Sequence, residues 1–577
     1  MSSSALRLLC GRTSFFNLCQ KYPPSFLSQL STLNFSTHSP FDSTYDVVVV
    51  GAGISGLSTA QALSIQHKID NVLVTEADHR VGGKITTKRN KDFLWEEGPN
   101  SCLMNDALYR AARDAGVESK ILSADPKLPR WILWGRRLRV APIGSYALKS
   151  DLLSTQGLLR AIRGVTGFGV SPAPPKGQEE SVEGFVRRTL GDEIFERLVE
   201  PFCSGVYAGD PSKLSMRAAF GKLVEFEETG DGSLLRGVFR YVMNKRRERR
   251  TGGAKDGDTV PLNETAKAPK SSSGPTVSSF EGGIEILPKA IAQKLGDRVR
   301  LGLRLVRIDP TQLADGTTAY RLSYRRMSHQ GDDDSSRTAG AVPRTAEGDV
   351  AAGDEDAVVE VVAKKVVLTT PAFDAADILS RSGLVAAANP LKEVDYPPVA
   401  LVVLSYDVDS ISAIHRVSHV AHGLSGFGQL HPRPEGLRTL GTIYGSTLFP
   451  NRSPVARTTL LNFVGGSTDR AVGSADPMAL AMEVDLDLKK SGLIREGAAK
   501  PEVLGVKVYP KAIPQFDIGH LDRVEKAKMM LKNERGGADW SGVKLAGNYV
   551  CGVAVGRCIE FGFEIAENLA QELARKK

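Results

Sequence analysis

The sequence predicts an α/β protein, α+β when the whole chain is counted, with a Rossmann-like nucleotide-binding domain. Three observations predict this fold. The apolar run Tyr45–Val50 leads into the turn Gly51-Ala52-Gly53-Ile54-Ser55-Gly56 and then into a helical pattern. A second apolar run, Val72–Thr75, ends at an acid, Glu76. Another strand–turn–helix pattern, Ala546–Glu560, lies near the end of the chain. Such segments are typical of parallel strands that hold a dinucleotide at their carboxyl ends.

Each residue of the first motif has a physical task. Gly51 permits the tight turn, Gly53 lets the backbone approach a pyrophosphate, and Gly56 lets the helix pack closely on the strand. The helix N-terminus offers free N–H groups to phosphates, and Glu76 can accept hydrogen bonds from a ribose. Purely structural glycines would not need the flanking strand, helix and acid, so we interpret the motif as a dinucleotide site.

Two further glycine-rich segments favour FAD as the dinucleotide. Gly82-Gly83-Lys84 follows the ribose acid, and Gly552–Gly556 precedes a helix near the far end of the chain. A compact nucleotide would not need a second helix start so remote in sequence, whereas an extended flavin dinucleotide would. We expect one FAD per chain, held without a covalent bond. The sequence shows no nucleophile-elbow serine and no phosphate loop with a lysine, and we expect no metal.

The rest of the chain alternates between strand and helix patterns. Predicted strands are Val299–Ile308, Val358–Thr370, Val399–Tyr406, Thr439–Tyr444 and Leu460–Val464. Predicted helices are Ala107–Ala115, Val182–Thr189, Glu193–Val199 and Ile559–Leu573. At 577 residues the chain is too long for a single core, so two or three domains are expected.

Composition excludes several classes of protein. The net charge of +8 is modest, and no nucleic-acid-binding module is recognisable, so we expect no nucleic-acid partner. The six cysteines show no metal-binding spacing, and Cys551 and Cys558 are interpreted as small buried apolar residues. No apolar run is long enough to span a bilayer, so any membrane association would be peripheral.

The N-terminal residues 1–44 are predicted to be an organelle transit peptide. They are rich in Ser and Thr, carry Arg7, Arg12 and Lys21, and contain no acid before Asp42. An ordinary disordered tail is the alternative. Composition alone does not separate plastid from mitochondrial targeting.

Three other segments have unusual composition. Asn244–Ser279, which begins with a basic run, and Ser328–Asp356 lack large apolar residues and are predicted to be disordered inserts flanked by strands. The basic run could contact anionic lipid or RNA, but a solvated loop is favoured. Arg130–Val170 mixes tryptophan and leucine with arginine, which suits either a membrane interface or a packed helix with one wet face.

The motifs together resemble those of a known family. The turn with Glu76-Ala77 and Gly82-Gly83-Lys84 resembles the FAD site of the amine-oxidase-like flavoproteins. Within that group the chain resembles the protoporphyrinogen oxidase family of plant and algal plastids. The matching segments are Arg197–Met216, Gly426–Pro432, Leu440–Tyr444, Ala512–Phe516 and Gly547–Cys558. The resemblance covers nearly everything from residue 46 to the end except the two inserts.

The resemblance implies a discontinuous FAD-binding domain (45–123, 237–373 and 538–577), a helical membrane-facing domain (124–236) and a mixed-sheet substrate domain (374–537). It implies these cofactor-binding residues: Gly51, Ala52, Gly53, Ile54, Ser55, Gly56, Glu76, Ala77, Lys84, Gly98, Pro99, Asn100, Ser101, Leu305, Asn548, Val553, Ala554 and Val555. In the substrate site, it implies that Arg130 binds a propionate. The apolar walls would be Leu430, Ile443 and Phe463, Gly205 would form the floor, and Asn100 would face the reacting side.

The residue types agree with this assignment, because a flat apolar macrocycle with carboxylate arms needs apolar walls and a cationic anchor. Without the motif match, Arg130 would be interpreted as a surface arginine, and Phe463 remains compatible with simple core packing.

The implied reaction is the six-electron oxidation of protoporphyrinogen IX to protoporphyrin IX, with three dioxygen molecules giving three of hydrogen peroxide. It is a step shared by haem and chlorophyll biosynthesis. The expected location is a plastid, on the thylakoid or envelope membrane, with the mitochondrion as the alternative. A homodimer and neighbouring enzymes of tetrapyrrole synthesis are expected as possible partners. The alternative functions are a polyamine oxidase or carotenoid desaturase, or a flavin-bearing assembly protein without turnover.

Overall fold

The first sheet of the structure contains the predicted nucleotide-binding strands. The fold is described from a computed structural model that covers residues 44–575 apart from 144–145, 147–149, 176, 252–276, 329–357, 418–419, 421 and 534–538. The strand order of this sheet is β10 (Val299–Arg300), β2 (Val72–Thr75), β1 (Thr44–Val50), β13 (Val358–Leu368), β12 (Thr318–Arg326) and β11 (Leu303–Gln312), with β19 (Val543–Leu545) also paired to β13. The pairs among β10, β2, β1, β13 and β19 are parallel.

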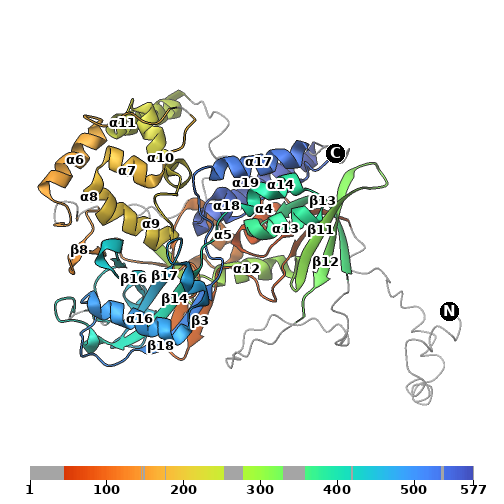
Figure 1. The fold of residues 1–577 in the computed structure, drawn as a ribbon. Helices are drawn as coiled ribbons and strands as arrows, with labels where there is room; N and C mark the ends of the chain where they lie inside the picture. The colour runs from red at the N-terminus through yellow and green to blue at the C-terminus, as the bar shows by residue number, and fades with distance from the viewer. Residues whose placement is uncertain are drawn as a thin grey trace, which may run out of the picture. The chain divides into compact units, whose positions relative to one another are not determined.

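Helices from both ends of the chain cover this sheet. A core cluster of fully buried valines and leucines joins β1 and β2 to four helices, α4 (Ile54–Ile65), α5 (Asp106–Ala115), α12 (Ile286–Leu295) and α19 (Val555–Ala574). Among these helices, α4 and α19 pack closely together, and Figure 1 shows them side by side beneath the label of α17. The C-terminal helix therefore completes the N-terminal domain, as the second glycine motif predicts.

A second group of helices packs together beside the same sheet. It contains α13 (Ala372–Arg381), α14 (Val385–Lys392) and α17 (His520–Asn533), with α13 in contact with β11 and α17 in contact with β19. The one-turn helix α18 (Asn548–Cys551) leads into α19. Both faces of the central strands are buried, because Val47, Val48 and Val49 are all fully inaccessible to solvent.

The second sheet has the order β18 (Glu502–Tyr509), β14 (Val399–Asp407), β17 (Arg457–Gly465), β16 (Thr439–Tyr444), β15 (Gly428–Leu430), β7 (Arg130–Leu133) and β8 (Leu138–Val140). All its neighbours are antiparallel except β15 and β7, which are parallel. The helix α16 (Pro477–Lys490) shares a buried cluster with Val402, Leu460 and Tyr444 and covers one face. The short helix α15 (Gly445–Leu448) follows β16.

Two small sheets connect these units. They are β3 (Thr87–Asn90) with β4 (Phe93–Glu96), and β5 (Cys102–Leu103) with β9 (Val277–Phe280) and β6 (Ile121–Ser123). Strand β4 contributes Phe93 and Trp95 to a cluster with Leu401, Val403 and Leu461 of the second sheet. The β3–β4 hairpin thus packs on the face of the second sheet opposite to α16.

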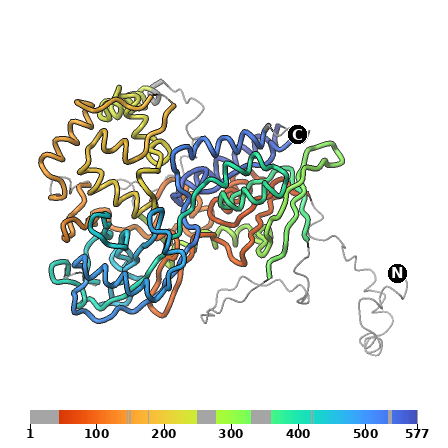
Figure 2. The backbone as a smooth tube through the Cα atoms, viewed as in Figure 1, coloured from red at the N-terminus to blue at the C-terminus, as the bar shows by residue number. Residues whose placement is uncertain are grey.

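A helical region contains α6 (Thr155–Thr166), α7 (Val182–Thr189), α8 (Asp192–Ile194), the π-helix η3 (Phe195–Val199), α9 (Glu200–Tyr207), α10 (Met216–Thr229) and α11 (Leu234–Thr251). Serine side chains cap three of its helix starts, and Ser181 Oγ accepts from Gly184 N at 3.0 Å in α7. The tube in Figure 2 shows this region as the part of the chain that runs from orange through yellow to yellow-green.

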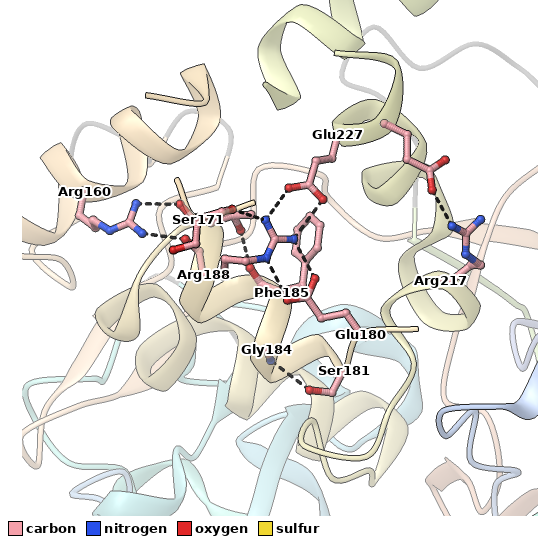
Figure 3. Close-up of polar contacts among 11 residues, drawn as sticks. Arg160, Ser171, Glu180, Ser181, Gly184, Phe185, Arg188, Arg217 and Glu227 are labelled. Atoms are coloured by element: carbon pink, nitrogen blue, oxygen red, sulfur yellow. Dashed lines mark hydrogen bonds and ion pairs between the residues drawn. The ribbon is translucent and has the colours of Figure 1, made fainter. Parts of the chain in front are cut away.

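One largely buried arginine, with a side chain 11% exposed, links elements of the helical region. Arg188 of α7 donates to both carboxylate oxygens of Glu180 and to both of Glu227 in α10, with shortest distances of 2.7 Å. Figure 3 shows its guanidinium between the two carboxylates, beside the ring of Phe185. Such paired, charge-assisted contacts fix both the distance and the orientation of the helices that carry them.

The structure corrects several predictions about individual elements. Val299–Ile308 is not one strand, because Gly302 with φ of +69° separates β10 from β11. Glu193–Val199 is partly a π-helix. Helix α11 runs to Thr251, and β9 starts at Val277, so both ends of the predicted insert Asn244–Ser279 are ordered, and a helix rather than a strand precedes it.

Other predictions are confirmed or lie outside the described residues. The strand Thr439–Tyr444 and the helix Val182–Thr189 have the predicted bounds. Arg130–Val170 is not one helix but contains β7, β8 and α6. The transit-peptide prediction and nearly all of the insert Ser328–Asp356 lie outside the described residues. The proposed division into domains remains a prediction.

Candidate active site

A cavity of about 730 Å³ lies at the carboxyl end of the parallel strands of the first sheet. Its volume is within the range of cofactor sites, and its walls come from segments far apart in the sequence. Most of the predicted cofactor residues line it: Gly51, Gly53, Ile54, Ser55, Glu76, Ala77, Lys84, Pro99, Leu305, Asn548, Val553 and Val555. The predicted glycine turn, acid and C-terminal motif therefore meet in one place.

The glycine-rich turn is held by the strands on either side. Gly51 has φ of +106°, which favours glycine, and its N–H donates to the carbonyl of Thr75 at 2.7 Å. Thr369, which follows β13, donates its hydroxyl to the carbonyls of Val50 and Gly51 at 2.8 and 3.0 Å. These bonds give the turn a fixed shape before any ligand binds.

Two glycines of the turn have different surroundings. A Cβ atom at Gly56 would lie 2.0 Å from the carbonyl oxygen of Gly51, so Gly56 is required for packing. A Cβ atom at Gly53 would meet no protein atom within 4 Å, and Gly53 lines the cavity. The open space above Gly53 is what a closely approaching pyrophosphate requires.

The Gly82-Gly83 segment lies over the same turn. The N–H of Gly82 donates to the carbonyl of Ala52 at 2.9 Å, and a Cβ atom at Gly83 would lie 3.3 Å from the Cα of Gly53. Both glycines line the cavity. Their small size lets two backbone segments close around the start of α4.

Glu76 is positioned by backbone N–H groups at the end of β2. Its carboxylate accepts from the N–H of Ala52 at 2.8 Å and from that of Asp78 at 2.9 Å. A carboxylate offers about four acceptor positions, so two remain for a ligand. Ribose hydroxyls are suitable donors for them.

The C-terminal motif places a second helix start at the cavity. Val555 is the first residue of α19, and Ile54 is the first residue of α4, and both line the cavity. Two helix N-termini direct partial positive charge into it. This arrangement fits a dinucleotide with a central pyrophosphate.

Lys84 is an exposed cation in the wall of the cavity. Its Nζ donates to the carbonyl of Lys511 at 3.2 Å and lies 4.8 Å from the ring centroid of Tyr509. Burial lowers the pKa of the Lys84 ammonium below its ordinary value. The contacts hold the side chain on the second sheet, since Tyr509 ends β18.

The remaining predicted cofactor residues, Ala52, Gly56, Gly98, Asn100, Ser101 and Ala554, do not line this cavity. A Cβ atom at Gly98 would lie 1.8 Å from the carbonyl of Lys84, so this glycine permits packing. Asn100 is 7% exposed, and among the described residues its Nδ2 has no hydrogen-bond partner. A buried amide group without a hydrogen-bond partner lowers the stability of the fold, and a bound ligand could accept this hydrogen bond.

Sequence reasoning missed one wall of the cavity. Thr369, Thr370 and Pro371, which follow β13, line it, together with Asp374 at the start of α13 and Arg304 of β11. Among the described residues, the hydroxyl of Thr370 is buried without a partner. The predicted strand Val358–Thr370 could have indicated this wall, because a parallel strand next to β1 ends at the same edge of the sheet as β1 does.

The predicted substrate residues lie on one face of the second sheet. In the strand register, Arg130 of β7 pairs with Gly428 of β15, and Gly428 pairs with Ile443 of β16. Leu430 of β15 pairs with Gly441 of β16, and Gly441 pairs with Phe463 of β17. Residues paired across neighbouring strands point to the same side, so the side chains of Arg130, Leu430, Ile443 and Phe463 share this face. It is the face opposite to α16.

The same face adjoins the cofactor cavity. Tyr509 pairs with Val399, which in turn pairs with Gly465. Gly465 is two residues beyond Phe463 on the same strand and therefore points to the same side, so the side chain of Tyr509 is also on this face. Tyr509 lines the cavity as well. Arg130 is exposed and lies 5.3 Å from the ring of Phe427, whereas Leu430, Ile443 and Phe463 are half-buried. On this face Ile443 and Phe463 also pack against the cluster that contains Phe93 and Trp95 of β4.

Helix α9 approaches this surface through a glycine. A Cβ atom at Gly205 would lie 2.4 Å from Cδ2 of Leu430, so a larger residue here would have to displace the end of that side chain. The structure therefore brings the predicted floor residue and one predicted wall residue together. Their roles toward a substrate remain predictions.

Comparison with known proteins gives the relatives of this chain. The model of the flavin containing amine oxidoreductase family matches residues 54–570. The chloroplastic protoporphyrinogen oxidase of Oryza sativa subsp. japonica is 45% identical, over 92% of this chain and 89% of that protein. The chloroplastic protoporphyrinogen oxidase 1 of Arabidopsis thaliana is 43% identical over 92% and 89%.

A crystal structure of a protein from Exiguobacterium sp. 255-15 has the same fold, with a TM-score of 0.65, 21% identity, and coverage of 92% of this chain and 99% of that one. The full-length matches to the plant proteins show more than the fold. The chain belongs to the flavin-containing amine oxidoreductases and, within them, to the chloroplast-type protoporphyrinogen oxidases.

Proposed function

We propose that this chain binds one FAD without a covalent bond and oxidises protoporphyrinogen IX to protoporphyrin IX with dioxygen as the electron acceptor. The observation that carries the proposal is the shared sheet face: Tyr509 lines the dinucleotide cavity, while Arg130, Ile443 and Phe463 lie on the same face beside it. A flavin and a large apolar anion would meet there. The names of the plant relatives support this substrate.

The residues of the cavity fit FAD in three ways. The space above Gly53 admits the pyrophosphate, the starts of α4 and α19 offer it N–H groups, and Glu76 accepts from the adenosine ribose. Bound FAD would supply the redox chemistry, as the acceptor of a hydride from a methylene bridge of the substrate and the donor of electrons to dioxygen.

The substrate face contributes binding and orientation. The Arg130 guanidinium pairs with a propionate, and the apolar side chains of Leu430, Ile443 and Phe463 bind the macrocycle. The strand register also puts the carboxylates Asp407 and Glu502 on this face, but Arg457 pairs with both, at 2.9 and 3.1 Å, so neither is expected to serve as a strong general base. The rate enhancement then comes mainly from holding the reacting bridge in near-attack geometry.

The decisive experiment combines colour, turnover and substrate choice. Purified protein is expected to be yellow, to convert protoporphyrinogen IX into fluorescent porphyrin with oxygen uptake and peroxide release, and to leave spermidine unchanged. Fluorescence no higher than the autoxidation blank, from protein that contains FAD, would refute the proposal. Turnover of spermidine would favour the amine-oxidase alternative.

Arg130→Ala tests the proposed anchor. Loss of a charge-assisted hydrogen bond costs about 1.5–3 kcal/mol, so the KM is expected to rise by ~10- to 100-fold while FAD content stays constant. Arg137→Ala is the matched control, because Arg137 is an exposed arginine of the same β7–β8 hairpin outside this face. Loss of FAD from Arg130→Ala would instead make Arg130 a structural residue.

We further propose that the protein works in a plastid, bound peripherally to a thylakoid or envelope membrane. None of the described helices has the length and apolar content needed to cross a bilayer. Helices α6 and α11, which pack against each other, expose Leu158, Leu159, Ile162, Leu235 and Phe239, each at least half exposed. Arginines lie among them, and such a surface suits a lipid interface.

A flotation assay with vesicles that contain anionic lipid tests this surface. Leu159→Asp with Phe239→Asp is expected to abolish most binding and to leave porphyrinogen oxidation in detergent intact. Met482→Asp is the control, because Met482 is 63% exposed on α16, outside the helical region. Equal binding by all variants would exclude this surface as the membrane contact.

A further inference from the structure

Two cysteines lie together in the wall of the cofactor cavity. Cys551 ends α18, Cys558 is in the first turn of α19, and their sulfur atoms are 4.0 Å apart. Cys558 is buried in the wall of the cavity, and Cys551 is half-buried. The sequence predicts small buried apolar residues at both positions, which is confirmed for Cys558, and the distance between the sulfurs also lets the two thiols react with each other.

Their surroundings favour reaction at Cys558. The hydrogen bond from the Cys551 thiol lowers the pKa of Cys558, and hydrogen bonding from Ser55 at the start of α4 acts in the same direction. Helix N-termini favour a thiolate, and two of them meet here. The other two cysteines of the described chain, Cys102 and Cys203, are buried, and burial raises the pKa of each to about 12.

The pair encloses a turn that the cofactor is expected to contact. Between Cys551 and the start of α19 lie Gly552, with φ of +111°, Val553 and Ala554. The Sγ atoms of Cys551 and Cys558 lie 3.6 and 3.3 Å from the carbonyl oxygen of Gly552, and Cys551 Sγ also lies 3.3 Å from that of Gly547. A disulfide would bring the sulfurs from 4.0 Å to about 2.05 Å, so this turn would have to move.

We propose that Cys551 and Cys558 form a peroxide-sensitive thiol pair whose oxidation to a disulfide loosens the flavin site. The Cys558 thiolate attacks hydrogen peroxide, becomes a sulfenic acid and releases water after protonation. The Cys551 thiol then displaces a second water and forms the disulfide. Two thiols lose two electrons in total, and one peroxide is reduced to two waters. This inference depends on the proposed function in one respect only: the oxidase reaction would be the natural source of the hydrogen peroxide.

The test uses purified protein loaded with FAD and peroxide added from a stock solution. After alkylation and cleavage at Arg557, which separates the two cysteines, the disulfide is detected by mass spectrometry as two linked peptides. The Kd for FAD is measured in parallel by flavin fluorescence. We expect to detect the linked peptides and to measure an approximately tenfold higher Kd for FAD, which corresponds to the loss of one backbone hydrogen bond. Dithiothreitol should reverse both changes.

Matched variants separate the pair from general oxidation. Cys551→Ser is expected to form no disulfide and to show no peroxide-dependent change in Kd, whereas Cys102→Ser is expected to respond like the unmodified protein. Two fully alkylatable thiols after peroxide treatment, or an oxidised pair with unchanged FAD affinity, would overturn the proposal. Because peroxide is added, these outcomes do not depend on whether porphyrinogen is oxidised.

Discussion

A single buried ion pair links the small sheets to the second sheet. Arg452 Nη2 lies 3.2 Å from Glu96 Oε1, and the two side chains are 6% and 0% exposed. Glu96 also accepts from Thr87 Oγ1 at 2.6 Å and from Ile284 N at 2.9 Å. Removing the arginine would leave a buried carboxylate without its counter-ion, and this costs more than the pair itself contributes.

We therefore expect Arg452→Ala to lower the free energy of unfolding by about 3–5 kcal/mol at neutral pH. Arg321→Ala is the control, since Arg321 and Glu360 form a pair at 3.8 Å with both side chains about half exposed. Its effect should not exceed about 1 kcal/mol. Thermal unfolding monitored by circular dichroism measures both. Equal effects would show that the buried pair contributes no more than a surface pair.

The cost of Arg452→Ala is expected to depend on pH. Burial raises the pKa of Glu96 in the folded protein, and the charge of Arg452 opposes this rise. Without Arg452 the folded pKa is higher still, so the folded state binds a proton more tightly than the unfolded state. Stability from such a group is present at low pH and is lost as pH rises through the folded pKa.

The penalty of Arg452→Ala should therefore be larger at pH 8 than at pH 5. Unfolding curves of the variant and the unmodified protein at both pH values measure it. In a Glu96→Gln background the difference between the two pH values should vanish, because the titrating group is gone. A penalty that falls as pH rises would contradict this assignment.

At the scale of elements, the start of α4 offers a clean comparison of two glycines. Gly53 has φ of −71° and ψ of 175°, which any L-residue can adopt, and a Cβ atom there would face open space. A Cβ atom at Gly56 would collide with the backbone of Gly51. Replacing Gly53 by alanine should therefore affect ligand binding, whereas replacing Gly56 by alanine should affect the stability of the protein itself.

Gly53→Ala is expected to leave the melting temperature of the cofactor-free protein unchanged and to raise the Kd for FAD at least ~tenfold, equivalent to about 1.4 kcal/mol. Gly56→Ala is expected to destabilise the cofactor-free protein itself by about 1–3 kcal/mol. Melting curves without FAD and FAD titrations distinguish the two. Tight FAD binding by Gly53→Ala would show that no pyrophosphate passes above this residue.

The elements also show how far the sequence predicts the fold. The turn at Gly51–Gly56 and the helix Val182–Thr189 are encoded locally, by a motif and by a capping serine, so their positions could be predicted. The extension of α11 to Thr251 was missed because its basic run was interpreted as a loop, although arginine and lysine favour helices.

At the scale of the whole molecule, long-range pairings limit prediction from sequence. The shared face of Arg130, Ile443 and Phe463 depends on the parallel pairing of β7 with β15, which no local pattern indicates. The Glu96–Arg452 pair and the cavity wall at Asp374 also depend on segments distant in sequence. The family resemblance predicted Arg130 together with Leu430, Ile443 and Phe463, but only the register shows that their side chains share one face.

The cavity walls come from distant parts of the chain, including the turn at Gly51–Ser55, the strand residues Leu303–Val306 and the C-terminal segment from Asn548 to Cys558. A ligand that contacts all of them binds only the folded state and stabilises it by mass action. Removal of FAD should therefore destabilise the whole unit and not one element. At a free FAD concentration of about 1,000 times Kd, the stabilisation is about 4 kcal/mol.

We expect FAD-free protein to melt at a lower temperature, and added FAD to restore the original value. FMN, which lacks the adenylate half, should restore less, because it cannot reach Glu76 and bridge both ends of the cavity. Hydrogen exchange should rise on FAD removal at the start of α4 and at the start of α19 together. Faster exchange at only one of these helices would mean that the two glycine-rich segments do not hold one cofactor between them.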